Sequence, residues 1–166
     1  MSTFVSVGNA TQSFQRLLDA VCEIAANLPQ PVVVQYGSLS DFNCKHCQCV
    51  AFMDMQEFES QVAEADLLIL HAGAGSVINA IKAGKVPIVM PRRVKLGEHI
   101  DDHQLEFARE LSKAGSVVLC EDTSFLSSAV TEALSRQSQN KLMIGYTKTP
   151  GMVGMIRSVL LSRSAK

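Results

Sequence analysis

The fold is decided by residues 66–76, which read DLLILHAGAGS. The unbroken aliphatic run at 67–70 predicts a strand buried on both faces, because a half-exposed strand would alternate apolar and polar residues. Glycines follow at Gly73 and Gly75, and an apolar segment then predicts a helix that ends at Gly84. This strand, turn and helix form the repeating unit of parallel α/β sheets.

The same alternation continues on both sides of this stretch. Apolar, β-branched runs predict strands at residues 3–7, 32–36, 49–53, 66–70, 86–90 and 116–120. Helical spacing of apolar residues predicts helices at residues 14–28, 57–65, 76–83, 101–113 and 125–134. We therefore expect an open, doubly wound parallel sheet of the Rossmann-like α/β class. Residues 1–140 would form one domain, and residues 141–166 a tail with an apolar helix at 152–160.

Length and composition limit the classes of function. The chain has 166 residues, 47% of them hydrophobic and 19% charged, which suits one globular domain. A formal net charge of −1 gives no general attraction to nucleic acid. No apolar run is long enough to cross a bilayer, and the first residues lack a basic region followed by an apolar one. We therefore expect a cytoplasmic protein whose contact with a membrane is at most peripheral.

Five cysteines, an odd number, are a poor basis for a disulfide framework, so we expect reduced thiols. Four candidate metal ligands lie within residues 44–49, CKHCQC. A tetrahedral zinc site normally draws ligands from two separate segments, and no second Cys/His pair follows at a suitable spacing. A surface loop without metal is therefore favoured over a zinc site.

Ligands of parallel sheets bind where the strands end. The glycines after residue 70 leave backbone N–H groups at a helix N-terminus open to a phosphate, although such glycines also serve merely to pack helix against strand. A dehydrogenase fingerprint is not favoured, because it belongs on the first strand and needs a third glycine where Asn79 stands.

A second candidate region follows residue 90 and reads PRRVKLGEHIDDHQ. Arg92 and Arg93 are suited to neutralising a diphosphate, and Asp102 and Gln104 to hydrogen-bonding sugar hydroxyls. The alternative is a solvated loop with local salt bridges, which is what charge runs usually are.

Together the two regions, in this order and spacing, resemble the C-terminal, donor-binding domain of GT-B glycosyltransferases of family 28. The resemblance extends to small stand-alone members: the PssE-type subunits of exopolysaccharide synthesis and the eukaryotic catalytic subunit of the dolichol-linked UDP-GlcNAc transferase. Its central motifs lie at residues 71–76, 83–93 and 97–104, with further likeness at residues 5–8, 14–18, 34–37 and 52–58.

The resemblance implies the donor half of an inverting glycosyltransferase that moves a sugar from a UDP-sugar to a lipid-linked acceptor in polysaccharide or glycan precursor synthesis. A membrane-anchored, PssD-like partner would supply the acceptor half and hold the subunit at the inner face of the membrane. Residues 152–160 would either contact this partner or cover the domain's own sheet. No metal or other cofactor is required. The alternative function is a sensor or scaffold that binds a nucleotide-sugar without transfer.

The resemblance also assigns the donor diphosphate to backbone and hydroxyl groups at the helix N-terminus, with an imidazole close by. Asn79 stands where many relatives carry a glutamate for the ribose hydroxyls, and its amide can still hydrogen-bond a diol. The residues implied in donor binding here are Gly8, Asn9, His71, Gly73, Gly75, Ser76, Asn79 and Arg92.

The transferred sugar is assigned by the resemblance to Asp102 and Gln104 at the next helix start. The general base is left open between residues of the partner and three titratable side chains of this chain. These three are Glu98, His99 and His103.

Overall fold

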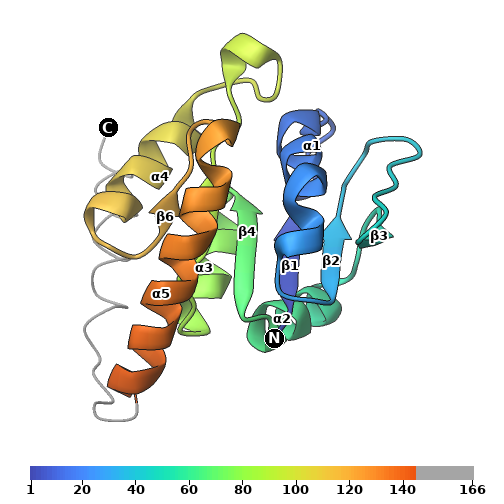
Figure 1. Cartoon of the computed structure of the whole chain (residues 1–166). Helices are drawn as coiled ribbons and strands as arrows, with labels where there is room; N and C mark the ends of the chain where they lie inside the picture. Colours follow the sequence, from blue (N-terminus) through green and yellow to red (C-terminus); the bar gives the residue numbers. More distant parts are fainter. Residues whose placement is uncertain (145–166) are drawn as a thin grey trace.

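The computed structural model describes residues 1–144, with side-chain surroundings through residue 140. The sheet has six strands in the order β3-β2-β1-β4-β5-β6, and every neighbouring pair is parallel (Figure 1). The predicted open, doubly wound parallel sheet is therefore confirmed. The strands are β1 (Thr3–Ser6), β2 (Val32–Gln35), β3 (Gln48–Val50), β4 (Leu67–His71), β5 (Ile88–Met90) and β6 (Val118–Leu119).

Helices cover both faces of this sheet. On one face, α1 (Gln15–Ile24) and α5 (Leu126–Ile144) lie side by side over the strands (Figure 1). The other face carries α2 (Met55–Glu64), α3 (Ala74–Lys82) and α4 (His103–Lys113). Short 3-10 turns are η1 (Ala25–Asn27), η2 (Val94–Leu96) and η3 (Thr123–Phe125). The expected helix at 152–160 lies outside the described residues.

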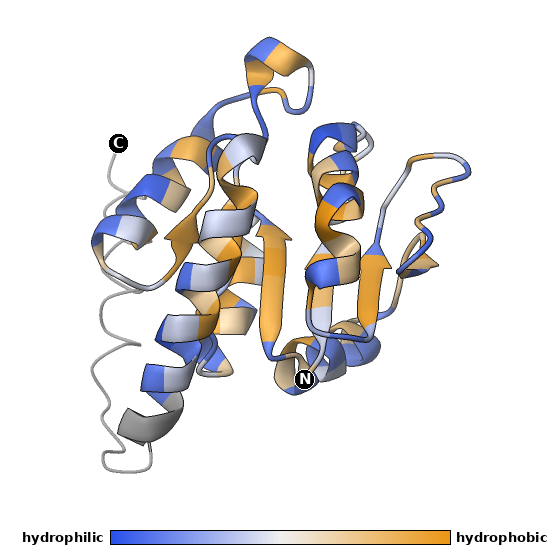
Figure 2. Ribbon diagram, in the orientation of Figure 1, coloured by the Kyte–Doolittle hydropathy of each residue, from blue (hydrophilic) through white to orange (hydrophobic). Residues whose placement is uncertain are grey.

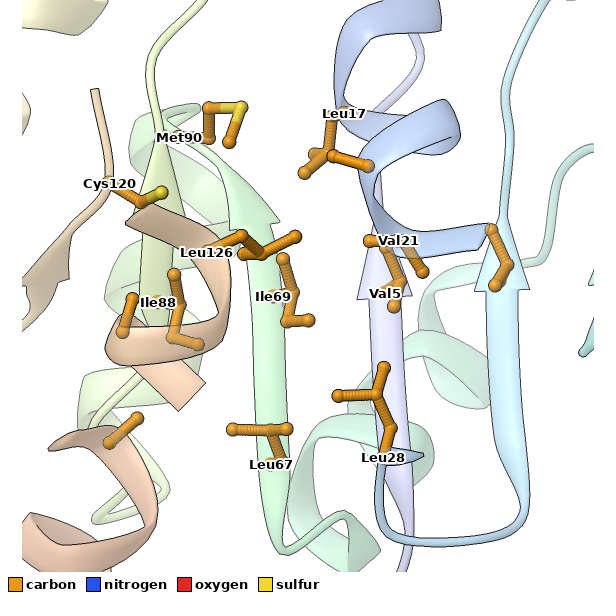
Figure 3. Close-up of a cluster of buried hydrophobic side chains, with 14 of the residues drawn as sticks. Val5, Leu17, Val21, Leu28, Leu67, Ile69, Ile88, Met90, Cys120 and Leu126 are labelled. Atoms are coloured by element: carbon orange, nitrogen blue, oxygen red, sulfur yellow. The ribbon is translucent and has the colours of Figure 1, made fainter. Parts of the chain in front are cut away.

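Strand β4 shows why the sheet needs cover on both sides. Residues 67–70 of this strand are apolar, and Figure 2 shows the strand in the colour of hydrophobic residues. All five residues of the strand, the final His71 included, are buried. Leu67 and Ile69 pack with α1 and α5, whereas Leu68 and Leu70 pack with α2 and α3. Figure 3 shows Ile69 among the side chains of the first cluster. Alternate side chains thus enter different halves of the core, as the period of a strand requires.

The expectation of five reduced thiols is wrong for two of them. Cys22 in α1 and Cys44 in the loop between β2 and β3 form a disulfide, with Cα atoms 5.8 Å apart. The loop folds back onto α1 and brings together residues that are 22 positions apart in the sequence. Cys47, Cys49 and Cys120 are free.

Two features are absent from residues 1–144, the part of the chain that the structure describes. No cluster of three or more His, Cys, Asp or Glu side chains in that range has a geometry suited to a metal ion. None of the helices in that range is long and apolar enough to span a membrane.

Candidate functional site

The candidate site lies at the edge of the sheet where the parallel strands end. Strand β4 lies between β1 and β5, so the segments that follow these three strands meet there. The first segment contains Gly8 and Asn9, the second is the turn at residues 71–76, and the third is the loop at residues 91–102. The sequence regions predicted to carry the function are thus neighbours in space.

His71, the last residue of β4, is at the centre of this edge. Its imidazole is 9% exposed and packs against the backbone of Gly8 and Gly73. A Cβ at Gly8 would lie 2.5 Å from the imidazole Cε1 and Nε2, and one at Gly73 would overlap Nε2. Gly8 also has a φ of +74°, which disfavours any other residue. Both glycines therefore make room for the imidazole.

The protonation of His71 follows from its surroundings. Burial, together with the charge of Arg92, lowers the pKa of His71 to about 4, so the ring is neutral at pH 7. Nδ1 lies 3.4 Å from the carbonyl oxygen of Ser6. A carbonyl only accepts hydrogen bonds, so we assign the proton to Nδ1 and leave Nε2 as an acceptor.

Helix α3 begins directly after this imidazole. Gly73 is its N-cap residue, and no side chain caps the helix. A Cβ at Gly75 would meet no atom within 4 Å, so the first turn is open on that side. The first N–H groups of a helix lack intrahelical partners and carry the positive end of the helix dipole. The start of α3 is therefore suited to binding an anion.

A cavity of about 260 Å³ lies on one side of this helix start. It combines apolar side chains from the region of α2 with amide and hydroxyl groups from the strand ends. Flat rings pack well on such apolar groups, and amides hydrogen-bond a diol or a base edge. The lining residues are Ser6, Gly8, Asn9, Gln35, Met53, Asp54, Met55, Phe58, His71, Gly75, Ser76 and Asn79.

A second cavity, also of about 260 Å³, lies on the other side. Its polar groups are two imidazoles, a carboxylate and an amide, which are suited to a polyhydroxylated ligand. The lining residues are Ala72, Gly73, Ala74, His99, Asp101, His103, Gln104 and Phe107. The two cavities thus meet at the first turn of α3. Gly75 and Ser76 line the first cavity, and Gly73 and Ala74 line the second.

Arg92 does not have the predicted role on a diphosphate. Its side chain is 0% exposed and lies 4.8 Å from the Phe14 ring centroid. The guanidinium donates to the carbonyl oxygens of Val7 at 2.8 Å, Gln12 at 2.8 Å and Glu98 at 3.0 Å. A longer bond reaches the carbonyl of Ser13. The assignment of Arg92 to donor binding is therefore wrong, because its donors hold the loop after β5 to the segment after β1.

Glu98 is likewise unsuited to act as a general base. Its side chain is 8% exposed, and both carboxylate oxygens lie 2.9 Å from guanidinium nitrogens of Arg16. The backbone N–H of Arg93 donates to the same carboxylate. These partners commit the carboxylate to holding the loop, and Glu98 lines neither cavity. Arg93, in turn, is paired with Glu121 at 3.0 Å.

His99 and His103 do face the second cavity, and Asp101 lies between them. Its carboxylate oxygens are 3.3 Å from Nδ1 of His99 and 3.4 Å from Nδ1 of His103. Asp102 instead accepts from the N–H of Val94 and does not line the cavity. The structure thus places Asp101 and not Asp102 at the cavity, because α4 begins at His103 rather than at residue 101.

Gln104 lies at the second cavity as expected. Its Oε1 accepts from the backbone N–H of Arg92 at 3.2 Å. This bond orients the amide and leaves its NH₂ group free to donate to a ligand. Of the predicted site residues, ten therefore line one of the two cavities, and Arg92, Glu98 and Asp102 line neither.

The sequence pattern did not point to Asp101 as a site residue, nor to the residues contributed by α2 and by the segment between β3 and α2. Met53, Asp54 and Phe58 line the first cavity. They follow the end of β3, and Asp54 caps α2 by accepting from the N–H of Glu57 at 2.8 Å. A strand end followed by an N-cap residue was the available signal.

Comparison with known proteins agrees with the sequence resemblance. The human UDP-N-acetylglucosamine transferase subunit ALG13 is 40% identical over 62 residues, which are 37% of this chain and 5% of that protein. The Yarrowia lipolytica protein of the same name is 34% identical over 67 residues, 40% of this chain and 32% of that protein. The UDP-N-acetylglucosamine–N-acetylmuramyl-(pentapeptide) pyrophosphoryl-undecaprenol N-acetylglucosamine transferase of Ralstonia nicotianae is 31% identical over 97 residues, 58% of this chain and 25% of that one.

Solved structures agree on the fold. The glycotransferase of kitacinnamycin superposes with a TM-score of 0.67 at 18% identity, over 95% of this chain and 39% of that one. The Acinetobacter baumannii MurG structure gives a TM-score of 0.56 at 21% identity, over 84% of this chain and 42% of that one. In each case this chain matches less than half of the other protein. The family model of the glycosyltransferase family 28 C-terminal domain matches residues 2–150, and the chain therefore belongs to this glycosyltransferase family.

Proposed function

We propose that this chain is the donor-binding half of a two-subunit inverting glycosyltransferase that uses a UDP-sugar. The observation that carries the proposal is the start of α3, an uncapped helix N-terminus between two cavities of different chemistry. A nucleotide-sugar has three parts in a matching order: a nucleoside, a central diphosphate and a sugar.

The nucleoside would lie in the first cavity and the sugar in the second. Phe58 and the methionines of the first cavity suit a base, and Asn79 suits the ribose hydroxyls. The backbone N–H groups at residues 74–76 would bind the diphosphate. His103, Gln104 and Asp101 would hydrogen-bond the sugar hydroxyls.

The charges of the site support the need for a partner. Arg16, Arg92 and Arg93 lie near this edge, and each is committed to groups of the protein itself. The described residues thus meet the negative charge of UDP mainly with the dipole of α3. We infer that a second, membrane-anchored subunit of PssD-like type contributes the missing cations together with the acceptor site, and holds this chain at the inner membrane face.

The names of the relatives support the same reading. Several are named as a subunit of a UDP-N-acetylglucosamine transferase, and the Ralstonia nicotianae relative is named for a pyrophosphoryl-undecaprenol acceptor. By analogy, we propose a lipid-linked acceptor in polysaccharide or glycan precursor synthesis.

The proposed reaction is a single displacement. A base removes the proton of the acceptor hydroxyl, whose oxygen attacks the anomeric carbon while the bond from that carbon to the diphosphate oxygen breaks. The N-terminus of α3 stabilises the charge that develops on the leaving UDP. His99 and His103, both next to Asp101, are the candidate bases of this chain, and the partner is the other source. The scheme requires no metal.

A domain that binds a nucleotide-sugar without transferring it is the second candidate. Asn79 favours it, because an amide replaces the carboxylate that many relatives use on the ribose. Its Nδ2 donates to Oε1 of Glu59 on α2 at 3.3 Å, so a carboxylate is still close to this position. Sugar transfer in the presence of the acceptor subunit separates the two functions.

The first test is calorimetric titration of the full chain with UDP, UDP-sugars and NADP. Gly75→Asp places a carboxylate at the start of α3 where space is open, and Gly75→Asn is the uncharged control of the same shape. We expect saturable UDP binding, weakened about tenfold or more by Gly75→Asp and much less by Gly75→Asn. Equal UDP affinity in the two variants, or binding of NADP in place of UDP, would contradict the proposed site.

A further inference from the structure

Four of the five cysteines gather away from the candidate site, around the loop between β2 and β3. Cys22 comes from α1, Cys44 and Cys47 from the loop, and Cys49 from β3. Cys44 forms the disulfide with Cys22, and its Sγ lies 3.3 Å from the free Sγ of Cys47. One sulfur therefore has two partners within reach.

This arrangement meets the requirements of thiol–disulfide exchange. Exchange needs a thiolate whose sulfur can approach one sulfur of a disulfide, while the other sulfur of that disulfide leaves as a thiolate. Cys47 is half-buried rather than enclosed, so its thiol is accessible to a base. Cys22 lies in α1 and remains in place when its bond to Cys44 breaks, so the reverse reaction stays open.

We propose that Cys44 exchanges its disulfide between Cys22 and Cys47. The thiolate of Cys47 attacks Sγ of Cys44, the Cys22–Cys44 bond breaks, and Cys22 leaves as a thiolate that takes up the proton lost by Cys47. One disulfide and one thiol are present before and after the step, so no external oxidant or reductant is needed. The exchange is independent of the sugar transfer proposed above.

The two disulfides differ in what they connect. The Cys22–Cys44 bond ties the loop to α1, whereas a Cys44–Cys47 bond closes a ring within the loop alone. The loop also contacts the segment after β1, since the Ser38 hydroxyl lies 3.1 Å from the carbonyl oxygen of Ala10 and 2.9 Å from that of Thr11, and its one hydrogen is shared between them. Exchange therefore releases from α1 a loop that packs on the segment after β1.

Trypsin can separate the two isomers because of where the lysines and arginines lie. Cleavage after Arg16, Lys45 and Lys82 gives one peptide, residues 17–45, with both Cys22 and Cys44, and a second, residues 46–82, with Cys47 and Cys49. The Cys22–Cys44 isomer leaves the peptides separate, and the Cys44–Cys47 isomer joins them. Mass spectrometry of the alkylated, unreduced digest then measures the proportion of each.

The experiment uses the full chain purified without reductant and incubated without oxygen at pH 9 before trapping. Burial and the neighbouring Cys49 raise the pKa of Cys47 to about 11, so the exchange is slow near neutrality and can be trapped by acid. We expect the joined peptides to form in the wild type, in Cys49→Ser and in Cys120→Ser, and to be absent in Cys47→Ser. In an oxidised Cys22→Ser variant the joined peptides should dominate.

Hydrogen exchange gives a second measurement. Backbone amides of residues 37–47 should exchange faster in Cys22→Ser than in Cys47→Ser, because only the latter keeps the bond to α1. Finding all five thiols reduced, a persistent Cys22–Cys44 bond with no joined peptides, or joined peptides that survive in Cys47→Ser would each overturn the proposal.

Discussion

The turn after β4 and the loop after β5 form the two sides of the same site but are built differently. In the turn at residues 71–76, the groups suited to bind an anion are backbone N–H groups at the start of α3, and the side chains at residues 73–76 are small enough to leave them open. In the loop at residues 92–102, most charged side chains bind the protein itself: Arg92 to carbonyls, and Glu98 to Arg16. A short turn is held in place by the strand and helix that it joins. A long loop must be held by its own side chains, and those side chains are then lost to the ligand.

The largest expected effect comes from removing the side chain that holds the loop. In Arg92→Met the buried carbonyls of Val7 and Glu98 and the partly buried carbonyl of Gln12 lose this donor. Unpaired buried polar groups cost about 1–3 kcal/mol each, so we expect the free energy of unfolding to fall by roughly 3–5 kcal/mol. Urea denaturation measures this loss.

Arg109→Met is the matched control, because its guanidinium is exposed and, among the residues that the structure describes, is paired with Glu121 at the surface. It should leave the free energy of unfolding close to that of the wild type, because surface ion pairs contribute little. If Arg92→Met kept wild-type stability and lost UDP binding instead, Arg92 would belong to the donor site after all, and the contrast between turn and loop would fail.

The turn after β4 has its own internal constraint, the neutral imidazole of His71. Its pKa in the folded state, about 4, is below the ordinary value of 6.5, because burial opposes the charged form. Between these two pH values the unfolded chain binds more protons at this residue than the folded chain does, so stability rises with pH across this window. The contribution is complete above pH 6.5 and falls by roughly 3 kcal/mol as the pH approaches 4.

The measurement compares the free energy of unfolding at pH 4.5 and pH 7 in the wild type and in His71→Asn. The asparagine side chain can still donate to the Ser6 carbonyl but does not titrate. The wild type should lose more stability on acidification than the variant, since carboxylates elsewhere titrate equally in both. Parallel pH profiles would mean that His71 is solvated or already charged in the folded protein.

Sequence reasoning predicted the sheet and the turn better than the loop, and the reason is the range of the interactions involved. Residues 67–70 of β4 are all apolar, and the turn that follows depends only on residues next to it in the chain. Arg92 donates to Val7 and Glu98 pairs with Arg16, and both partners are distant in the sequence. Nothing in the local sequence therefore indicates that these two charged side chains are buried. Cys22 and Cys44 were missed for the same reason.

The second cavity shows how a small error of register changes an assignment. Residues 101 and 102 are both aspartates, and the sequence pattern cannot decide which of them precedes the first helical turn. Starting α4 at His103 places Asp101 in the cavity and directs Asp102 to the N–H of Val94. Helix boundaries commonly shift by one or two residues, which here moves the acidic group from one side of the helix start to the other.

The smallest expected effect separates the two glycines of the turn, which the sequence pattern treats alike. Gly73→Ala puts a methyl group into the His71 imidazole and should destabilise the protein by about 1–3 kcal/mol, as overpacking does. Gly75→Ala meets no atom within 4 Å and lies in the first turn of α3, where alanine should stabilise by up to about 1 kcal/mol. Thermal denaturation of the two variants should therefore move Tm in opposite directions.

If both variants lowered stability equally, the turn would need glycine at residue 75 for its own folding, and the openness of the α3 N-terminus would no longer point to a ligand. If Gly75→Ala instead raised Tm while weakening UDP binding, this glycine would be kept at the expense of stability, as expected where a ligand approaches the backbone closely.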